Sequence, residues 1–222
     1  MSGVAQGAAA LRAHPAAMRL IGADIMCSFL YGTQMVLLLL VSRHAGLGAQ
    51  GYGYMFAAVG AGGLAGTALA GRASRSSRPG LVQAAALTAV GLPTLLLAVT
   101  RWPAAAAAVV LAGLTGLGAL LVEILTETTL QRTLDEDVFG RAYGLALPAS
   151  IAGIVAGSAI APVLASLLGT SGALVTTGGA VLAYTLLILR AGAGRDEHRV
   201  PDTSDDTIVL ARPAVADAVP AR

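Results

Sequence analysis

Three polar side chains recur at four-residue intervals in one long apolar stretch of this 222-residue sequence: Glu123, Glu127 and Gln131. On a helix this spacing places all three on one face, where they form a polar stripe. Glu123 lies nine residues before Arg132, which corresponds to about 13 Å along a helix axis. A carboxyl group so deep in an apolar segment is costly, and it is a candidate site for a proton or a cation.

Other polar residues interrupt the apolar stretches at different depths. Asp24 follows Arg19 by five residues, about 7–8 Å along a helix, and Glu127 is similarly shallow. Both can serve a transport pathway or simply reach the polar edge of a membrane. Gln34 is deeper and can hydrogen-bond a solute or, as we favour, a neighbouring helix. The stripe itself has two interpretations: the wall of a water-filled pathway, or a helix end that emerges early and packs on loops.

The segments that carry these residues are too apolar for an ordinary soluble domain. The sequence is 56% hydrophobic and 12% charged, with a mean hydropathy of +0.76. Segments of about 20 apolar residues cross a bilayer as helices, and the alternation expected of barrel strands is absent. We predict an all-α membrane protein of six transmembrane helices at about 20–42, 53–71, 80–100, 103–128, 145–168 and 171–190.

The arginines lie mainly in alternate gaps between these spans, which predicts the topology. Ten lie on one side, against only Arg43 and Arg101 on the other, so the positive-inside rule places both termini in the cytoplasm. We expect a cytoplasmic N-terminal segment at 1–17 without a signal-peptide core, a bundle at 18–190, and a disordered cytoplasmic tail at 191–222. The ten are Arg12, Arg19, Arg72, Arg75, Arg78, Arg132, Arg141, Arg190, Arg195 and Arg199.

Two of the predicted spans share a sequence pattern. Residues 62–70 read GGLAGTALA and residues 153–161 read GIVAGSAIA, so five of nine positions are identical at an offset of 91 (153 − 62). The two spans would cross the membrane in opposite directions, as in a 3+3 inverted repeat. Chance similarity between Ala/Gly-rich helices is the alternative.

Each segment also contains a Gly-x-x-x-Gly motif, which lets two helices approach closely. Ordinary packing is a sufficient explanation of these motifs, and surfaces that slide during a conformational change are a second one. The glycines are Gly62 and Gly66 in the second span, and Gly153 and Gly157 in the fifth.

Two loops resemble those of a known transporter family. Residues 51–72, which end in Gly71-Arg72 and are followed by Arg75 and Arg78, resemble the start of the second half of major facilitator superfamily transporters. Residues 130–144, LQRTLDEDVFGRAYG, are similar to a cytoplasmic loop of the bacterial exporter-like branch of that superfamily. The sequence departs from the family in lacking an acidic residue at 70–74 and a proline at Leu134.

The resemblance implies the C-terminal six-helix half of a transporter in the bacterial cytoplasmic (inner) membrane. Such a protein moves a small solute by alternating access, here with efflux and proton coupling as the expectation. The missing half would be a separate chain or a second copy, unless the chain is a truncated remnant. Charged residues of the cytoplasmic loops would either gate transport or only set the topology: Arg72, Arg75, Arg78, Arg132, Asp135 and Arg141.

Other classes of function find little support in the sequence. It contains no metal-ligand spacing, catalytic triad or phosphate loop, so we expect neither an enzyme nor a bound metal or cofactor, and no nucleic-acid partner. Its single cysteine, Cys27, is expected to act as a small buried hydrophobic residue. The competing interpretation is a membrane assembly or regulatory subunit that transports nothing.

Overall fold

Helices account for almost all of the chain that the structure describes. The structure is a computed structural model, and it describes residues 15–44, 46–76, 78–99, 105–134 and 136–196. Within these ranges it contains no strand. Five helices are long and apolar enough to cross a membrane. They are α2 (Pro15–His44), α3 (Gly48–Ala73), α4 (Pro79–Leu97), α5 (Ala105–Thr133) and α6 (Glu136–Asp196).

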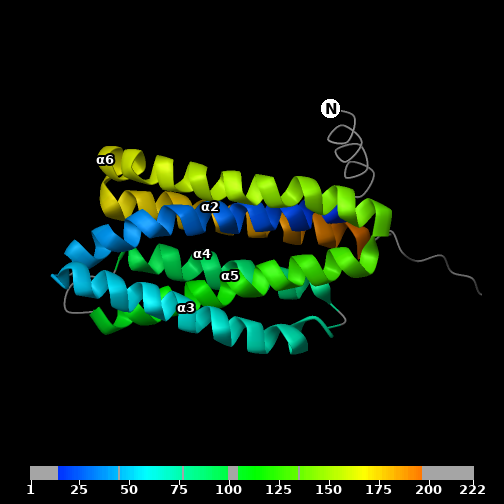
Figure 1. Cartoon of the computed structure of the whole chain (residues 1–222), viewed down its shortest axis with the longest axis horizontal. Coiled ribbons are helices and arrows are strands. Elements are labelled where there is room, and N and C mark those ends of the chain that lie inside the picture. The colour runs from blue at the N-terminus through cyan, green and yellow to red at the C-terminus, as the bar shows by residue number, and fades with distance from the viewer. Residues whose placement is uncertain (1–14, 45, 77, 100–104, 135, 197–222) are drawn as a thin grey trace, which may run out of the picture.

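Each predicted span overlaps one of these helices over most of its length, and the last two spans share α6. Helix α6 has 61 residues, about 92 Å if it were straight, far more than a bilayer requires. It turns back at Gly169, whose φ of 72° and ψ of 171° are not helical (Figure 1). Glycine tolerates this positive φ because it has no Cβ. The turn separates the predicted spans 145–168 and 171–190.

The helix bounds refine the predicted spans at several ends. Helix α4 ends at Leu97, three residues before the predicted end of the third span, and residues 100–104 lie outside the described part of the chain. Helix α6 continues to Asp196, past the predicted start of the tail at 191. The N-terminal residues 1–14 and the C-terminal residues 197–222 also lie outside the described ranges.

Helices α3 and α5 approach each other backbone to backbone at glycines. A Cβ atom on Gly62 would collide with the carbonyl oxygen of Gly113, and one on Gly66 with that of Leu117. In the reverse direction, a Cβ on Gly116 would collide with Val59 O. Such close approach gives helices in lipid the dispersion contacts that the hydrophobic effect cannot supply there.

Helix α6 packs against α2 in the same way before Gly169 and against α4 after it. Gly153 and Gly157 face the carbonyl oxygens of Ile25 and Phe29 in α2. Beyond the turn, a Cβ atom on Gly178 would lie 2.9 Å from the carbonyl oxygen of Gly91 in α4. The Gly-x-x-x-Gly motifs are thus interhelical contacts in the described structure.

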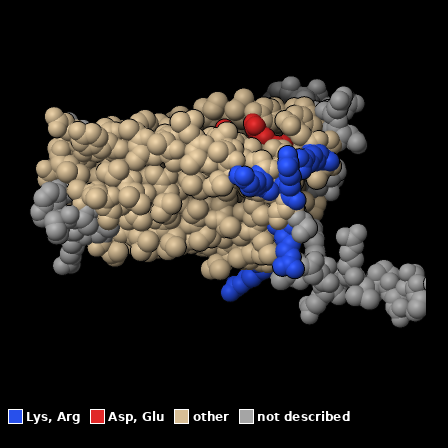
Figure 2. All heavy atoms as spheres, turned by 90° about the horizontal axis from the view of Figure 1, so that it is seen from below, with Lys and Arg blue, Asp and Glu red and all other residues tan. Residues whose placement is uncertain are grey.

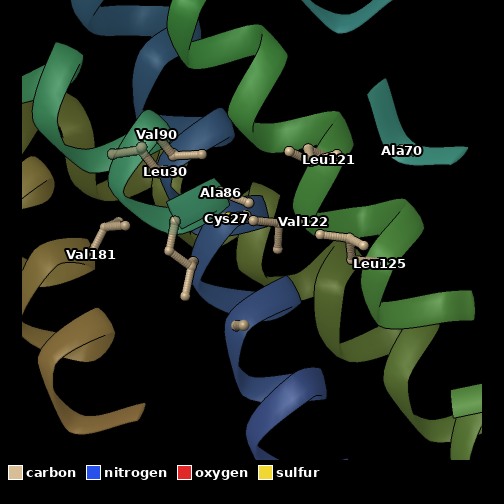
Figure 3. Packing of buried hydrophobic residues seen from close by; sticks show 11 residues of the cluster. Cys27, Leu30, Ala70, Ala86, Val90, Leu121, Val122, Leu125 and Val181 are labelled. Atoms are coloured by element: carbon tan, nitrogen blue, oxygen red, sulfur yellow. The ribbon is translucent and has the colours of Figure 1, made fainter. Parts of the chain in front are cut away.

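A buried cluster near the centre of the bundle joins all five helices (Figure 3). Cys27 belongs to it as a free thiol with 6% of its surface exposed, so the prediction of a buried small hydrophobic residue is confirmed. Figure 3 shows members of the cluster from several helices, including Leu30, Val90, Val122 and Val181. Because this cluster packs α2 against α5, it fixes the parts of these two helices that carry Asp24, Glu123 and Glu127.

We predict that Gly157→Ala destabilises the bundle, because its Cβ would collide with Phe29 O and α6 would have to move from α2. Overpacking of this kind costs about 1–3 kcal/mol. The matched control is Gly179→Ala in the same helix, where a Cβ atom meets nothing within 4 Å. Thermal unfolding in detergent, followed by circular dichroism, should show a lower midpoint for the first variant alone. Equal midpoints would contradict this packing.

Candidate functional site

A groove of about 360 Å³ lies between α2, α5 and the part of α6 before Gly169. Three carboxylates line it, and we call it the acidic groove. Most of its remaining wall is apolar or aromatic. Its lining residues are Ile21, Asp24, Cys27, Ser28, Tyr31, Ala119, Leu120, Glu123, Thr126, Glu127, Leu130, Tyr143, Ala146, Leu147, Ser150, Ile151 and Ile154.

Two of the three carboxylates are bound by hydroxyl groups of α6. Ser150 Oγ donates a hydrogen bond of 2.5 Å to Asp24 Oδ2, which joins α6 to α2. Tyr143 Oη donates one of 2.8 Å to Glu127 Oε1, which joins α6 to α5. Charge-assisted hydrogen bonds of this kind are stronger than neutral ones. The two carboxylates therefore hold the N-terminal part of α6 against its neighbours.

Glu123 differs from the other two carboxylates. Its side chain is exposed in the groove, and it has no hydrogen bond to any other described residue. It lies one helical turn from Glu127 on the same face of α5, about 6 Å further from the end of the helix. Glu123 is thus the carboxylate whose oxygens are available to a proton or a ligand.

The remaining pathway candidates lie outside the acidic groove. Gln34 is 3% exposed, and its Nε2 donates a hydrogen bond of 3.0 Å to Thr94 Oγ1 in α4. This contact agrees with the favoured interpretation of Gln34 as a link between helices. Gln131 is exposed at the end of α5 and is not among the lining residues.

The arginines of the predicted cytoplasmic loops gather at one end of the molecule (Figure 2). Arg72, Arg75 and Arg78 are exposed there, around the loop from α3 to α4. Arg132 Nη1 donates a hydrogen bond of 2.9 Å to the carbonyl oxygen of Ser74 in this loop. Asp135 and the side chain of Arg141 lie outside the part of the chain that the structure describes.

Sequence reasoning missed the groups that hold the carboxylates. Tyr143 and Ser150 are seven residues apart, two helical turns, and so they lie on one face of α6. That spacing was a usable signal, but their partners are 16 and 126 residues away in the sequence. Phe139, whose ring stacks on Tyr143 with centroids 5.6 Å apart, supports the position of the tyrosine.

Carboxylates in a groove with an apolar wall can exchange protons or attract a cation, and hydroxyl groups beside them can hold a solute. Within the described residues, no group of three or more histidine, cysteine, aspartate or glutamate side chains is arranged to hold a metal ion.

A family model described as transmembrane secretion effector, of the major facilitator type, matches residues 8–218. The chain belongs to this family. Neither the curated proteins nor the solved structures gave a match. Membership of the transmembrane secretion effector family confirms the resemblance to major facilitator transporters. Together with the apolar helices, it identifies a multi-pass membrane transporter, and transporters of this kind are in general not enzymes.

We predict that Gln34→Leu lowers thermal stability and leaves solute movement intact, because it removes the buried hydrogen bond to Thr94. Bonds of this type in membrane bundles contribute about 0.6 kcal/mol on average and up to about 1.7. Gln131→Leu, at an exposed position of α5, is the control and should not change the unfolding midpoint. If Gln34→Leu kept its stability but lost transport, a pathway role for Gln34 would be restored.

Proposed function

We propose that this member of the transmembrane secretion effector family exports a small solute by alternating access, in exchange for protons carried by Glu123. The observation that carries the proposal is the exposed Glu123 in a groove of about 360 Å³ between helices that span the membrane. A scaffold protein has no use for an unbonded carboxylate at this depth, since its burial in the bilayer is costly.

The acidic groove supports a second bundle as a partner. Leu147 and Ile151 on its wall are 49% and 54% exposed, and Glu123 beside them is exposed as well. Facing lipid, this mixed surface would leave Glu123 without water or a counter-charge. We propose that a second six-helix bundle covers the groove and supplies the opposite wall of the pathway. Six-helix halves that rock against each other around a central site are the general mechanism of such transporters.

The helix contacts support six crossings arranged as a 3+3 inverted repeat. Gly62 and Gly66 contact residues 113 and 117, whereas Gly153 and Gly157 contact residues 25 and 29. The first pair precedes the second by 91 residues (153 − 62), and the contacted residues differ by 88 (113 − 25). An exchange of the two halves of the chain would therefore convert one contact into the other.

The contact between α4 and α6 fits the same exchange. Gly91 of α4 packs on Gly178 of α6, and they are 87 residues apart (178 − 91). Such a pair is expected at the axis of a pseudo-two-fold repeat, where one residue meets its own counterpart. This agreement favours the repeat over chance similarity between Ala/Gly-rich helices.

The end of the bundle that carries the arginines is proposed to face the cytoplasm of a bacterial cell, in its inner membrane. Of the arginines whose side chains the structure describes, only Arg43 of α2 lies at the opposite end. Short loops rich in arginine stay on the cytoplasmic side during insertion. The acidic groove starts near this end, at Leu130, and continues to Ala119, about 16 Å along α5.

The three carboxylates have different proposed roles. Glu123 exchanges protons, whereas Asp24 and Glu127 bind Ser150 and Tyr143 and so couple the movement of α6 to the charge of the groove. The glycine contacts provide smooth surfaces on which these helices can shift. Because the lining residues that the structure describes include three carboxylates and neither arginine nor lysine, the groove favours a neutral or cationic solute over an anionic one.

Glu123→Gln should abolish proton exchange while leaving the bundle folded, because Glu123 makes no hydrogen bond to the described residues. The assay uses everted vesicles from cells that contain the full protein, with ethidium as a cationic apolar probe. Wild-type vesicles should lose part of their pH gradient when ethidium is added, and the variant should lose at least about tenfold less. This corresponds to about 1.4 kcal/mol in transition-state free energy.

Two further variants make this assay decisive. Gln131→Ala, outside the groove, should behave as the wild type does, and Glu123→Asp should keep part of the exchange because it retains the carboxyl group. Unchanged coupling in Glu123→Gln would remove Glu123 from the mechanism. Wild-type vesicles that respond to neither ethidium nor a panel of neutral apolar dyes would favour the non-transporting subunit or a truncated remnant.

A photo-reactive residue at Leu147 should cross-link the full chain to a second bundle in native membranes, either another protein or a second copy. The same residue at Leu64, which is 75% exposed on α3 and does not line the groove, is the control and should react with lipid. Mass spectrometry of the products identifies the partner. Lipid adducts alone at Leu147 would mean that the bilayer covers the groove and that the proposed partner does not exist.

A further inference from the structure

A second pocket, of about 260 Å³, lies at the arginine-rich end of the bundle. We call it the basal pocket. It lies between the start of α2, the end of α3, the start of α4 and the adjoining parts of α5 and α6. Its lining residues are Ala16, Arg19, Leu20, Ala73, Ser74, Pro79, Gly80, Gln83, Leu125, Thr129 and Ile188.

The basal pocket and the acidic groove use different faces of the same helices. On α5, Glu123 and Glu127 line the acidic groove, whereas Leu125 and Thr129 line the basal pocket. Residues two apart on a helix point to nearly opposite sides. The basal pocket is therefore separate from the proposed transport pathway.

A hydrogen-bonded chain of buried polar groups lies in and beside the wall of the basal pocket. Gln83 is 3% exposed, and its Nε2 donates a hydrogen bond of 3.2 Å to Thr126 Oγ1. Thr126 Oγ1 in turn donates one of 3.5 Å to the carbonyl oxygen of Leu20. These bonds join α4, α5 and α2, so the pocket belongs to the folded bundle and does not depend on a loop.

Two arginines lie at the pocket, and its described lining residues include no carboxylate. Arg19 is the one ionisable residue in the lining, and its Nε donates to Pro15 O, which leaves the terminal nitrogens of the guanidinium unbonded among the described residues. Arg132 reaches the same edge, because its Nη1 donates to the carbonyl oxygen of the lining residue Ser74. Two guanidinium groups without a carboxylate partner among the described residues favour an anionic ligand.

The rest of the lining matches the other part of an amphipathic ligand. Leu20, Leu125 and Ile188 provide an apolar wall next to Arg19, and Ser74 and Thr129 contribute hydroxyl groups. A Cβ atom on Gly80 would meet nothing within 4 Å, so there is free space at the start of α4. Basic pockets between helices near the cytoplasmic surface are typical sites for acidic lipid headgroups.

We propose that the basal pocket binds an anionic phospholipid, with its phosphate at Arg19 and Arg132 and part of an acyl chain against Leu20, Leu125 and Ile188. The lipid joins α2, α5 and α6 at the end where the proposed cytoplasmic loops meet. Its binding is independent of the proposed transport activity, because no residue of the pocket lines the acidic groove.

The test is a native mass spectrometry titration of the full chain in detergent with phosphatidylglycerol, phosphatidylcholine of the same chains, or inorganic phosphate. Phosphatidylglycerol should bind more tightly than phosphatidylcholine. Arg19→Gln should lower the affinity for phosphatidylglycerol about fivefold, as expected for one arginine near an acidic headgroup. Arg19→Lys should retain much of the affinity because it keeps the charge. The control is Arg75→Gln, an exposed arginine at the same end that does not line the pocket, which should change the affinity less than twofold.

Three results would overturn the proposal. Equal losses for Arg19→Gln and Arg75→Gln would assign the binding to the general charge of this end. Equal affinities for the two phospholipids would mean that the arginines do not recognise the negative charge of the headgroup. Binding of inorganic phosphate as tight as that of the lipid would identify a soluble phosphate site in place of a lipid site. Circular dichroism of each variant ensures that a loss of binding is measured on folded protein.

Discussion

Close contact between helix backbones at glycine residues is the interaction on which the rest of this bundle depends. In lipid, helices gain little from burying apolar side chains, since the lipid chains are equally apolar. They gain dispersion contacts when their backbones approach, and Gly62, Gly116 and Gly157 allow that approach at positions where any side chain would collide with a carbonyl oxygen. Gly157, together with Gly153, holds α6 against α2 and thereby determines the shape of the acidic groove.

The placement of charge follows from this packing. Once α2, α5 and α6 are in contact, Asp24 and Glu127 lie within reach of the hydroxyl groups of Ser150 and Tyr143, which partly offset the cost of their burial. Glu123 has no such partner among the described residues and is exposed to the groove. The groove is thus an acidic surface on which Glu123 is the carboxylate without a hydroxyl partner among the described residues, as the proposed pathway requires.

The location of the helices was largely predictable from the sequence, because apolar length and arginine position reflect the bilayer itself. Even the turn near Gly169 was expected from the gap between two apolar stretches. The site was less predictable. The stripe on α5 indicated Glu123, but the same periodicity grouped Gln131 with it, although Gln131 is exposed at the end of α5 and is not among the lining residues of the groove. Periodicity shows which residues share a face, and it does not show which helix covers that face.

The two pockets show how little sequence distance separates surfaces of opposite charge on one helix. On α5, Glu123 and Glu127 face the acidic groove, while Leu125 and Thr129 face the basal pocket with its arginines. On α2, Arg19 and Asp24 divide in the same way. This arrangement keeps carboxylates and guanidinium groups apart, so that neither neutralises the other. A bundle whose charges instead paired internally would have no unpartnered carboxylate for a proton and no unpaired arginine for a phosphate.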